Sequence, residues 1–143
     1  MLMGTYQQKI DAKHRIFVPA KFREELGDII IAAKTGDCIS LFREDTFQSY
    51  AEELLGNLPK QDKRTRQLSR TIYANAIRCE VDKQGRILLS ADQAARAKLD
   101  RDCVVIGVDG RAEIWSKQVW EEYDASASDN FEDLASDLAK EYL

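Results

Sequence analysis

The sequence lacks several features that would assign it to a common class of protein. Although 44% of its residues are hydrophobic, no stretch approaches the roughly 18 consecutive apolar residues of a membrane-spanning helix. Its first residues, Met1 to Tyr6, show no basic region followed by an apolar core, so no secretion signal is expected. We therefore expect a globular protein of the cytoplasm with no membrane partner.

Histidine and cysteine are scarce, and this argues against an enzyme. The chain has a single histidine, His14, and its three cysteines, Cys38, Cys79 and Cys103, are too far apart for a metal clip. We expect them to be small buried apolar side chains, since a reactive thiol would need an activating partner. No glycine-rich phosphate loop is present either. The sequence predicts no catalytic activity, no cofactor and no metal.

Negative charge predominates overall, but it is unevenly placed. The formal net charge is -4, whereas residues 121–143 alone carry eight acidic side chains and one lysine. The other 120 residues carry 20 basic and 17 acidic side chains. Local patches govern contact with phosphates more than the sum over the chain does. A mildly basic body with an acidic tail is therefore compatible with a nucleic-acid partner.

One pattern occurs twice in the chain. Residues 11–18 align without gaps on residues 82–89, an offset of 71. Residues 41–50 align on residues 114–123 with an offset of 73, so the copies differ by a two-residue insertion. Self-similarity over such a distance indicates two related structural modules.

Each copy contains an Asp-x-x-x-Arg loop, from Asp11 to Arg15 and from Asp82 to Arg86. Residues of alternating polarity predict a strand before each loop, and a short apolar run predicts another after it. A short helix and two further strands follow in each copy. The predicted strands cover residues 6–10, 16–18, 29–32 and 39–42 in the first copy, and 77–81, 87–89, 103–106 and 112–115 in the second.

Capping signals and apolar stripes predict the helices. Pro19 is expected as the first residue of the short helix in copy one, and Ser90–Gln93 has the form of a capping box in copy two. An apolar stripe over 47–58 predicts a longer helix that weakens and ends near Gly56 and Pro59.

Two further segments have opposite charge. Residues 60–70 predict a basic connecting helix with Leu68 and Ile72 facing inward, and its charges either contact DNA or form a solvated face. An apolar stripe over 131–142 predicts a solvated amphipathic helix in the acidic tail. The chain thus divides into a first module (5–47), a helical connector (48–75), a second module (76–119) and an acidic helical tail (120–143).

This arrangement of strand, Asp-x-x-x-Arg loop, strand and short helix resembles the MraZ family of bacterial proteins, whose halves each resemble swapped-hairpin DNA-binding domains of the AbrB/SpoVT type. The resemblance extends from Met3 through both motifs to the Glu-Ile-Trp-Ser segment at 113–116. It implies an α+β fold: two tandem AbrB/SpoVT-like β-rich modules with pseudo-two-fold symmetry, plus connecting and C-terminal helices.

The resemblance also implies a function and partners. Proteins of this kind are transcriptional regulators that bind short direct repeats in double-stranded DNA, upstream of the division and cell-wall gene cluster that contains their own gene. They assemble into ring-like homo-oligomers. We accordingly expect a cytoplasmic, nucleoid-associated protein.

The first copy departs from the family pattern at His14, where a glycine usually stands, as Gly85 does in the second copy. A tight loop often needs a positive φ at this position, which glycine adopts freely and histidine tolerates better than most other residues. We therefore expect the two loops to be unequal.

Arginine suits recognition of guanine because its planar fork donates two hydrogen bonds, to O6 and N7. We assign base contacts to Arg15 and Arg86. Supporting DNA contacts are assigned to Lys13, His14, Lys83 and Gln84, and a loop-shaping role to Asp11, Asp82 and Gly85. The competing interpretation is that each Asp–Arg pair only holds its turn as a salt bridge, but its recurrence favours function.

Other assignments stay open at this point. The aromatic residues Phe42, Phe47, Trp115 and Trp120 fit the core or a subunit interface better than they fit base stacking. An oligomeric scaffold whose loops bind protein would also be compatible with the repeats. So would an antitoxin-like module acting through its tail, although the duplication argues against it.

Overall fold

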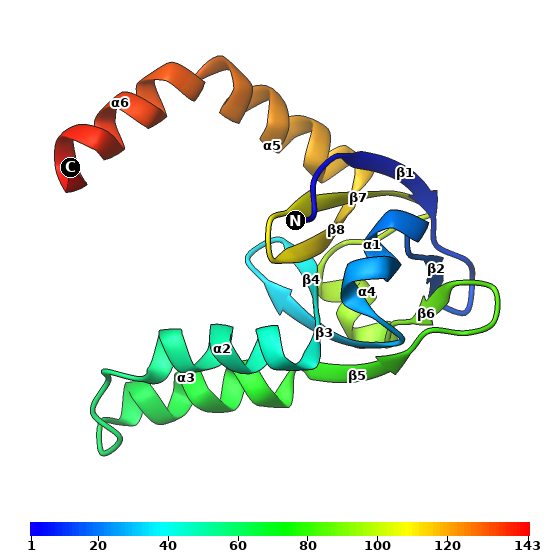
Figure 1. Ribbon diagram of the computed structural model, residues 1–143, viewed down its shortest axis with the longest axis horizontal. Helices are drawn as coiled ribbons and strands as arrows, with labels where there is room; N and C mark the ends of the chain where they lie inside the picture. The colour runs from blue at the N-terminus through cyan, green and yellow to red at the C-terminus, as the bar shows by residue number, and fades with distance from the viewer.

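The computed structural model describes residues 1–143, and its two halves repeat one order of elements (Figure 1). The first half comprises β1 (Thr5–Lys9), β2 (Arg15–Phe17), α1 (Ala20–Leu26), β3 (Ile29–Thr35), β4 (Cys38–Phe42), α2 (Glu44–Leu55) and α3 (Lys63–Ala74). The second comprises β5 (Ala76–Glu80), β6 (Arg86–Leu88), α4 (Ala91–Arg96), β7 (Asp102–Val108), β8 (Arg111–Ser116), α5 (Lys117–Asp129) and α6 (Phe131–Tyr142). The α+β class and the duplicated unit are confirmed.

The two halves exchange strands within one antiparallel sheet. Its order is β1-β7-β8-β4-β3-β5, so the first strand of each half pairs with the third strand of the other. The fourth strands, β4 and β8, meet at the centre. Strands β2 and β6 pair with each other as a separate two-stranded ribbon. This reciprocal exchange gives the pseudo-two-fold symmetry, and it intertwines the repeats. The residue boundaries drawn for the modules stay predictions.

One hydrophobic core serves both halves. Eighteen buried residues form its main cluster, including Ile16 and Ile87 of the ribbon, Phe22 of α1, Ile30 of β3 and Ile114 of β8. Burial of such side chains drives folding in proportion to the apolar area removed from water. Because residues from both repeats share this cluster, each half depends on the other for a buried core.

Two aromatic clusters cover the other face of the sheet, where the alternate residues of each strand point. The phenylalanine cluster contains Phe42 and Phe47, whose ring centroids lie 5.6 Å apart. The tryptophan cluster consists of Trp115, Trp120 and Tyr123, with the two indoles 5.3 Å apart. Trp120 is half-buried and the other three predicted residues are buried, which confirms their expected packing role.

Burial also explains the cysteines. Cys38, Cys79 and Cys103 are all buried, as expected, and their thiols are free. Desolvation raises the pKa of each thiol to about 11, so all three are protonated at neutral pH. A thiol in this state is a poor nucleophile.

Several details of the helices differ from the sequence-based expectation. Pro19 is the N-cap of α1, since its ψ of 138° is extended and helical residues start after it. Helix α2 stops before its C-cap residue Gly56, which leaves Leu58 outside the helix. Ile72 packs inward as predicted, whereas Leu68 is exposed because the α2–α3 hairpin projects from the body (Figure 1). None of the helices has the length and apolar character required to cross a bilayer.

The predicted capping box at the start of α4 is present, and it yields a stability prediction. Gln93 N–H donates to Ser90 Oγ at 3.0 Å, and Ser90 N–H donates to Gln93 Oε1 at 3.3 Å. We expect Ser90→Ala to lower the free energy of unfolding by about 1 kcal/mol in urea denaturation. Ser116→Ala is the matched control, because that N-cap serine makes no side-chain capping bond. Equal losses from both variants would contradict the capping role.

Candidate nucleic-acid interface

The first Asp-x-x-x-Arg motif forms a tight loop between β1 and β2. Asp11 Oδ1 accepts hydrogen bonds from the backbone N–H groups of Lys13 and Arg15, both at 2.9 Å. Asp11 Oδ2 accepts a third from Arg15 Nε at 2.7 Å. Within the loop, His14 N–H donates to the Asp11 carbonyl at 2.9 Å. The aspartate therefore shapes the turn and orients the arginine at the same time.

The second motif reproduces this geometry between β5 and β6. Asp82 Oδ1 accepts from the N–H groups of Gln84 and Arg86, both at 2.9 Å, and Oδ2 accepts from Arg86 Nε at 2.9 Å. Gly85 N–H donates to the Asp82 carbonyl at 3.0 Å. The duplicated sequence has thus produced two nearly identical loops.

The residue before each arginine adopts the left-handed backbone conformation that the sequence predicted. His14 has a φ of 66° and Gly85 a φ of 88°. The hydrogen bonds of the two loops match in spite of the His14 substitution, whereas the surroundings of the two residues differ. A Cβ on Gly85 would lie 2.8 Å from Arg23 Cζ, and Arg23 Nε donates to the Val18 carbonyl at 3.1 Å. Sequence reasoning assigned no role to Arg23, although it belongs to the Pro-Ala-x-x-Arg pattern after the first loop.

The β2–β6 ribbon brings both motifs onto one surface. Its register places Arg15 opposite Leu88 and Phe17 opposite Arg86. Because alternate residues of a strand share a face, these four side chains lie together, and the isoleucines between them point into the core. Arg15 and Arg86 are therefore diagonal neighbours across the ribbon. The Cα atoms of such a diagonal pair lie about 7–8 Å apart. We call these four side chains the ribbon face. Figure 1 shows both Asp-x-x-x-Arg loops at the same end of the molecule as strands β2 and β6.

The ribbon face is apolar as well as basic. Phe17 is 45% exposed and Leu88 57% exposed, although both are large hydrophobic residues in strands. Arg86 Cζ lies 5.8 Å from the centre of the Phe17 ring, a cation–π geometry that helps to hold the guanidinium in place. Sequence reasoning missed both residues, although the alignment of 11–18 on 82–89 places them at equivalent positions.

Each arginine uses only part of its guanidinium inside the chain. The Nε of Arg15 bonds to Asp11 and that of Arg86 to Asp82, and neither Nη group of either arginine donates within the chain. The Arg15 and Arg86 side chains are 36% and 21% exposed, respectively. The salt bridges of the competing interpretation therefore exist, and they leave the outer nitrogens free for another acceptor.

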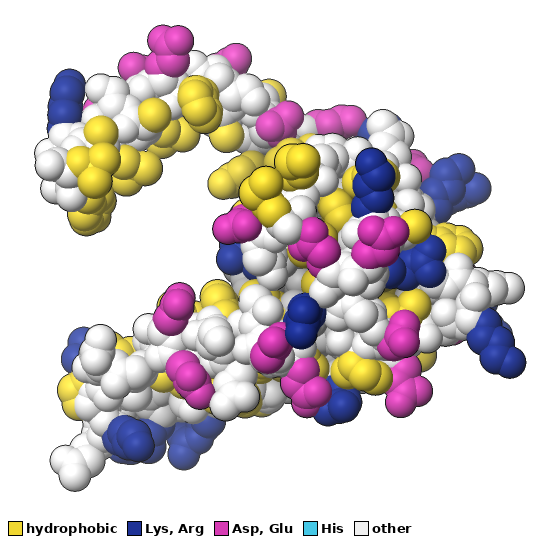
Figure 2. Space-filling model, in the orientation of Figure 1, with side chains coloured by type: hydrophobic (Ala, Val, Ile, Leu, Met, Phe, Trp, Pro, Cys, Tyr) yellow, Lys and Arg dark blue, Asp and Glu magenta, His cyan; other side chains and the backbone are white.

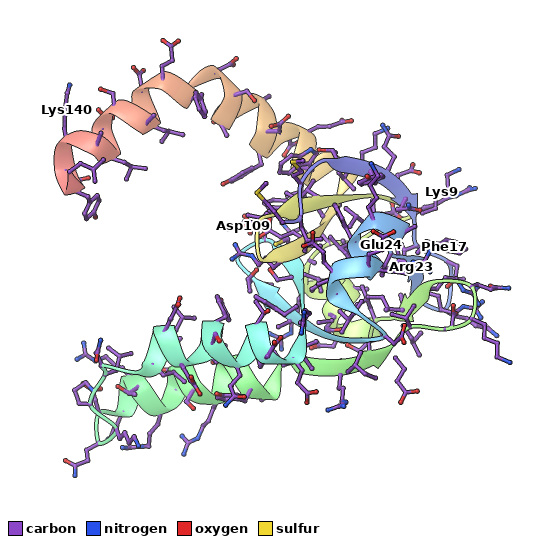
Figure 3. All side chains as sticks on the ribbon, in the orientation of Figure 1. Lys9, Phe17, Arg23, Glu24, Asp109 and Lys140 are labelled. Atoms are coloured by element: carbon purple, nitrogen blue, oxygen red, sulfur yellow. The ribbon has the colours of Figure 1, made fainter.

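Further polar residues of the two loops surround the ribbon face. Lys13, Lys83 and Gln84 are exposed and His14 is half-buried. Figure 3 places Lys9, Phe17 and Arg23 at this same end of the molecule. Lysine and arginine side chains are prominent there in Figure 2. The basic helix α3 lies on the opposite side of the body (Figure 1).

The loop hydrogen bonds lower the pKa of Asp11 and Asp82 below the ordinary value of 3.8, chiefly through the backbone N–H groups of Arg15 and Arg86. A depressed folded-state pKa gives stability that is present above the unfolded value and lost as pH falls through the folded value. We expect NMR titration of the carboxyl carbons to give both midpoints below 3.8. The same carboxyls in urea-unfolded protein are the reference, and equal midpoints in the two states would refute the proposed hydrogen-bond effect.

A family model matches the chain twice, over residues 1–71 and 72–141, and it is described as "MraZ protein, putative antitoxin-like". The chain belongs to the MraZ family. Its duplicated match agrees with the two repeats of the fold.

Curated relatives cover nearly all of this MraZ-family chain, and each is named "Transcriptional regulator MraZ". The relative from Caldanaerobacter subterraneus subsp. tengcongensis is 46% identical over 139 residues, which are 96% of each chain. The relative from Desulforamulus reducens is 44% identical over 96% of this chain and 97% of its own. That from Ligilactobacillus salivarius is 41% identical over 96% of each.

Proposed function

We propose that this MraZ-family protein is a sequence-specific DNA-binding transcriptional regulator that contacts bases through the ribbon face. The observation that carries the proposal is the pair of arginines on one surface, each held through Nε with its outer nitrogens unbonded. A guanidinium held in this way presents the two donors that guanine O6 and N7 accept. Prior positioning also reduces the entropy that ordering a long side chain would cost on binding.

The other loop residues have supporting roles in this proposal. Lysines and polar side chains at the loop tips contact phosphates, which adds affinity that depends on salt but not on sequence. Phe17 and Leu88 offer apolar surface of the kind that contacts thymine methyl groups. The phosphate-contacting set is Lys13, His14, Lys83 and Gln84, and the loops are shaped by Asp11, Asp82 and Gly85.

One ribbon face offers few contacts, so useful affinity requires several subunits to act together. We propose self-association into a ring-like homo-oligomer whose regularly spaced ribbon faces match a row of short direct repeats. Its operator would lie upstream of the division and cell-wall gene cluster that includes its own gene. The protein would act at the nucleoid in the cytoplasm, and its function includes no catalytic step.

Selection of bound duplexes from a random pool, followed by gel-shift titration, tests the proposed function. At fixed physiological salt, we expect the selected direct repeats to bind at least roughly a thousandfold more tightly than scrambled duplexes. Equal affinity for both would favour the protein-interaction scaffold instead. An antitoxin-like module would act through a disordered tail, and nothing in helices α5 and α6 favours that alternative.

A further inference from the structure

Equivalent positions beside the two Asp-x-x-x-Arg loops can be matched through the pseudo-two-fold symmetry. Next to the first loop, Ile10 N–H donates to the Arg101 carbonyl at 3.0 Å. Next to the second loop, Val81 N–H donates to the Asp28 carbonyl at 2.9 Å. Ile10 and Val81 are the residues that precede the two loop aspartates. Arg101 and Asp28 are therefore equivalent in space, and each stands directly beside a loop.

Two further pairs of equivalent positions lie near these residues. Lys9 and Glu80 are the last residues of β1 and β5. Lys117 and Glu44 are the first residues of α5 and α2. Lys117 shares a cleft with Arg101, and Glu44 shares the equivalent cleft with Asp28. We call Lys9, Arg101 and Lys117 the first flank, and Glu80, Asp28 and Glu44 the second flank.

The two flanks have opposite charge at all three positions, since the first is basic and the second is acidic at each. The loops themselves do not differ in this way, because each carries one lysine, Lys13 or Lys83. Five acidic residues and one arginine line the cleft at the second flank, whereas three acidic and two basic residues line the equivalent cleft at the first. Charge therefore breaks the pseudo-symmetry beside the loops.

The cations of the first flank are available to an external anion. Lys9 and Arg101 are exposed, and Lys117 is half-buried. None of the ion pairs within the chain includes any of the three. Lys9 stands opposite Asp102 in the register of β1 and β7, yet these two side chains form no ion pair.

The arginines that reach the second flank are already paired. Arg78 Nη1 lies 2.5 Å from Glu44 Oε1, and Arg43 Nε lies 3.2 Å from Asp45 Oδ1. The second loop has a different cation beside it, Arg23 of α1, which packs against Gly85. The residue equivalent to Arg23 in α4 is an alanine. The cations nearest to the two loops thus occupy non-equivalent positions.

A groove connects the first flank to the ribbon face. It has a volume of about 330 Å³, and Lys9, Lys117 and Phe17 all line it. Figure 3 shows Lys9 near Phe17 at the end of the molecule that carries both loops. A duplex seated on the ribbon face therefore comes within reach of the long first-flank side chains.

The ribbon face alone gives a DNA site no direction. Arg15 is equivalent to Arg86 and Phe17 to Leu88, so this face is nearly unchanged by the pseudo-two-fold rotation. A two-stranded ribbon fits the major groove, which has a phosphate backbone along each side. A two-fold symmetric surface reads a palindrome, because its halves meet the same bases. A direct repeat has a direction, so its recognition requires an asymmetric feature of the protein.

We propose that the first flank binds the phosphate backbone on its side of the groove and thereby seats the duplex asymmetrically on the ribbon face. Phosphates are attracted to the basic flank and repelled by the acidic one. Phosphate contacts fix the register and orientation of a protein on DNA, whereas base contacts specify the sequence. The two arginines then meet non-equivalent bases, and the preferred site is directional. This inference rests on the proposed function and names the residues that give its site a direction.

Charge reversal on the first flank tests the phosphate contacts. The double variant Lys9→Glu, Arg101→Asp introduces the residues that occupy the equivalent positions of the second flank. At physiological salt, we expect its affinity for the selected direct repeats to fall at least roughly tenfold. The slope of log affinity against log salt concentration should become shallower by about 2 for each repeat engaged. Fluorescence anisotropy at several salt concentrations measures both quantities.

The reciprocal variant Glu80→Lys, Asp28→Arg is the matched control, because it exchanges the same residue types on the second flank. It should bind the direct repeats at least as tightly as the wild type. With both flanks basic, inversion of one repeat in the duplex should cost less than roughly twofold in affinity, against at least roughly fivefold in the wild type. All four substituted residues are exposed. Circular dichroism and light scattering verify fold and assembly.

These outcomes separate the inference from the proposed function. A wild type that does not distinguish selected from scrambled duplexes would overturn both. If the wild type is specific, and its affinity and salt slope survive Lys9→Glu, Arg101→Asp, only the phosphate contacts of the first flank are wrong. If the reciprocal variant keeps the full cost of inversion, the charge difference between the flanks is not the source of direction.

Discussion

Replacing Arg15 or Arg86 with alanine is expected to weaken binding to direct-repeat DNA sharply while leaving fold and assembly intact. A good bidentate contact to guanine is worth about 1–3 kcal/mol, or about 5-fold to 150-fold in affinity. The contact is lost in every subunit that engages a repeat, so the loss for the assembly exceeds that of a single contact. Stability should change little, because each arginine pairs with an aspartate at the surface.

Fluorescence anisotropy with labelled specific and scrambled duplexes measures this effect. Arg96→Ala is the matched control, because Arg96 Nε pairs with Asp92 Oδ2 at 2.9 Å in the same way but lies on α4, outside the ribbon face. It should leave specific binding almost unchanged. Arg15→Lys and Arg86→Lys keep the charge and lose the fork, so they should reduce the preference for the specific duplex more than general affinity. Unchanged affinity in both alanine variants would refute the ribbon-face proposal.

Features that depend on near neighbours in the sequence were predictable. Ser90 and Gln93 stand three residues apart, and a capping box needs only that spacing. The left-handed conformation of His14 and Gly85 follows from the tight loop that each Asp–Arg motif closes. The order of the strands and short helices followed from local patterns in the same way, because the duplication supplied the strand, loop and short-helix patterns twice.

Features that depend on distant partners were not predictable. Strand β1 shows an alternating pattern that would suit a partner from either half, and packing of the shared core selects β7. The pairing of β2 with β6 likewise joins residues far apart in the sequence, so two separate loops become one surface. Phe17 and Leu88 are typical strand residues in the sequence, and only the ribbon shows that they face solvent.

Gly85 is the position in the loops where a small change should affect stability most. An L residue held in the left-handed region is strained by roughly 1–2 kcal/mol, and Gly85 has a φ of 88°. In Gly85→Ala the new Cβ would also lie 2.8 Å from Arg23 Cζ. Arg23 would have to move, which weakens its hydrogen bond to the Val18 carbonyl. We expect a loss of about 1–3 kcal/mol in unfolding free energy, measured in urea.

His14→Gly is the symmetric counterpart and should behave differently. The substitution relieves backbone strain at a φ of 66° but also gives the unfolded chain more freedom, so the change should stay below about 1 kcal/mol. Adding Arg23→Ala to Gly85→Ala removes the close contact between the new Cβ and the Arg23 guanidinium. The double variant should therefore lose less unfolding free energy than the sum of the two single variants. If Gly85→Ala cost no more than His14→Gly, the loops would be equivalent, and the packing of Arg23 against the second loop would have no energetic consequence. A larger loss of unfolding free energy in Gly85→Ala than in His14→Gly would show that only the second copy requires glycine. Gly85 lies at the junction between the halves, where its carbonyl accepts a hydrogen bond from Val18 N–H at 2.9 Å.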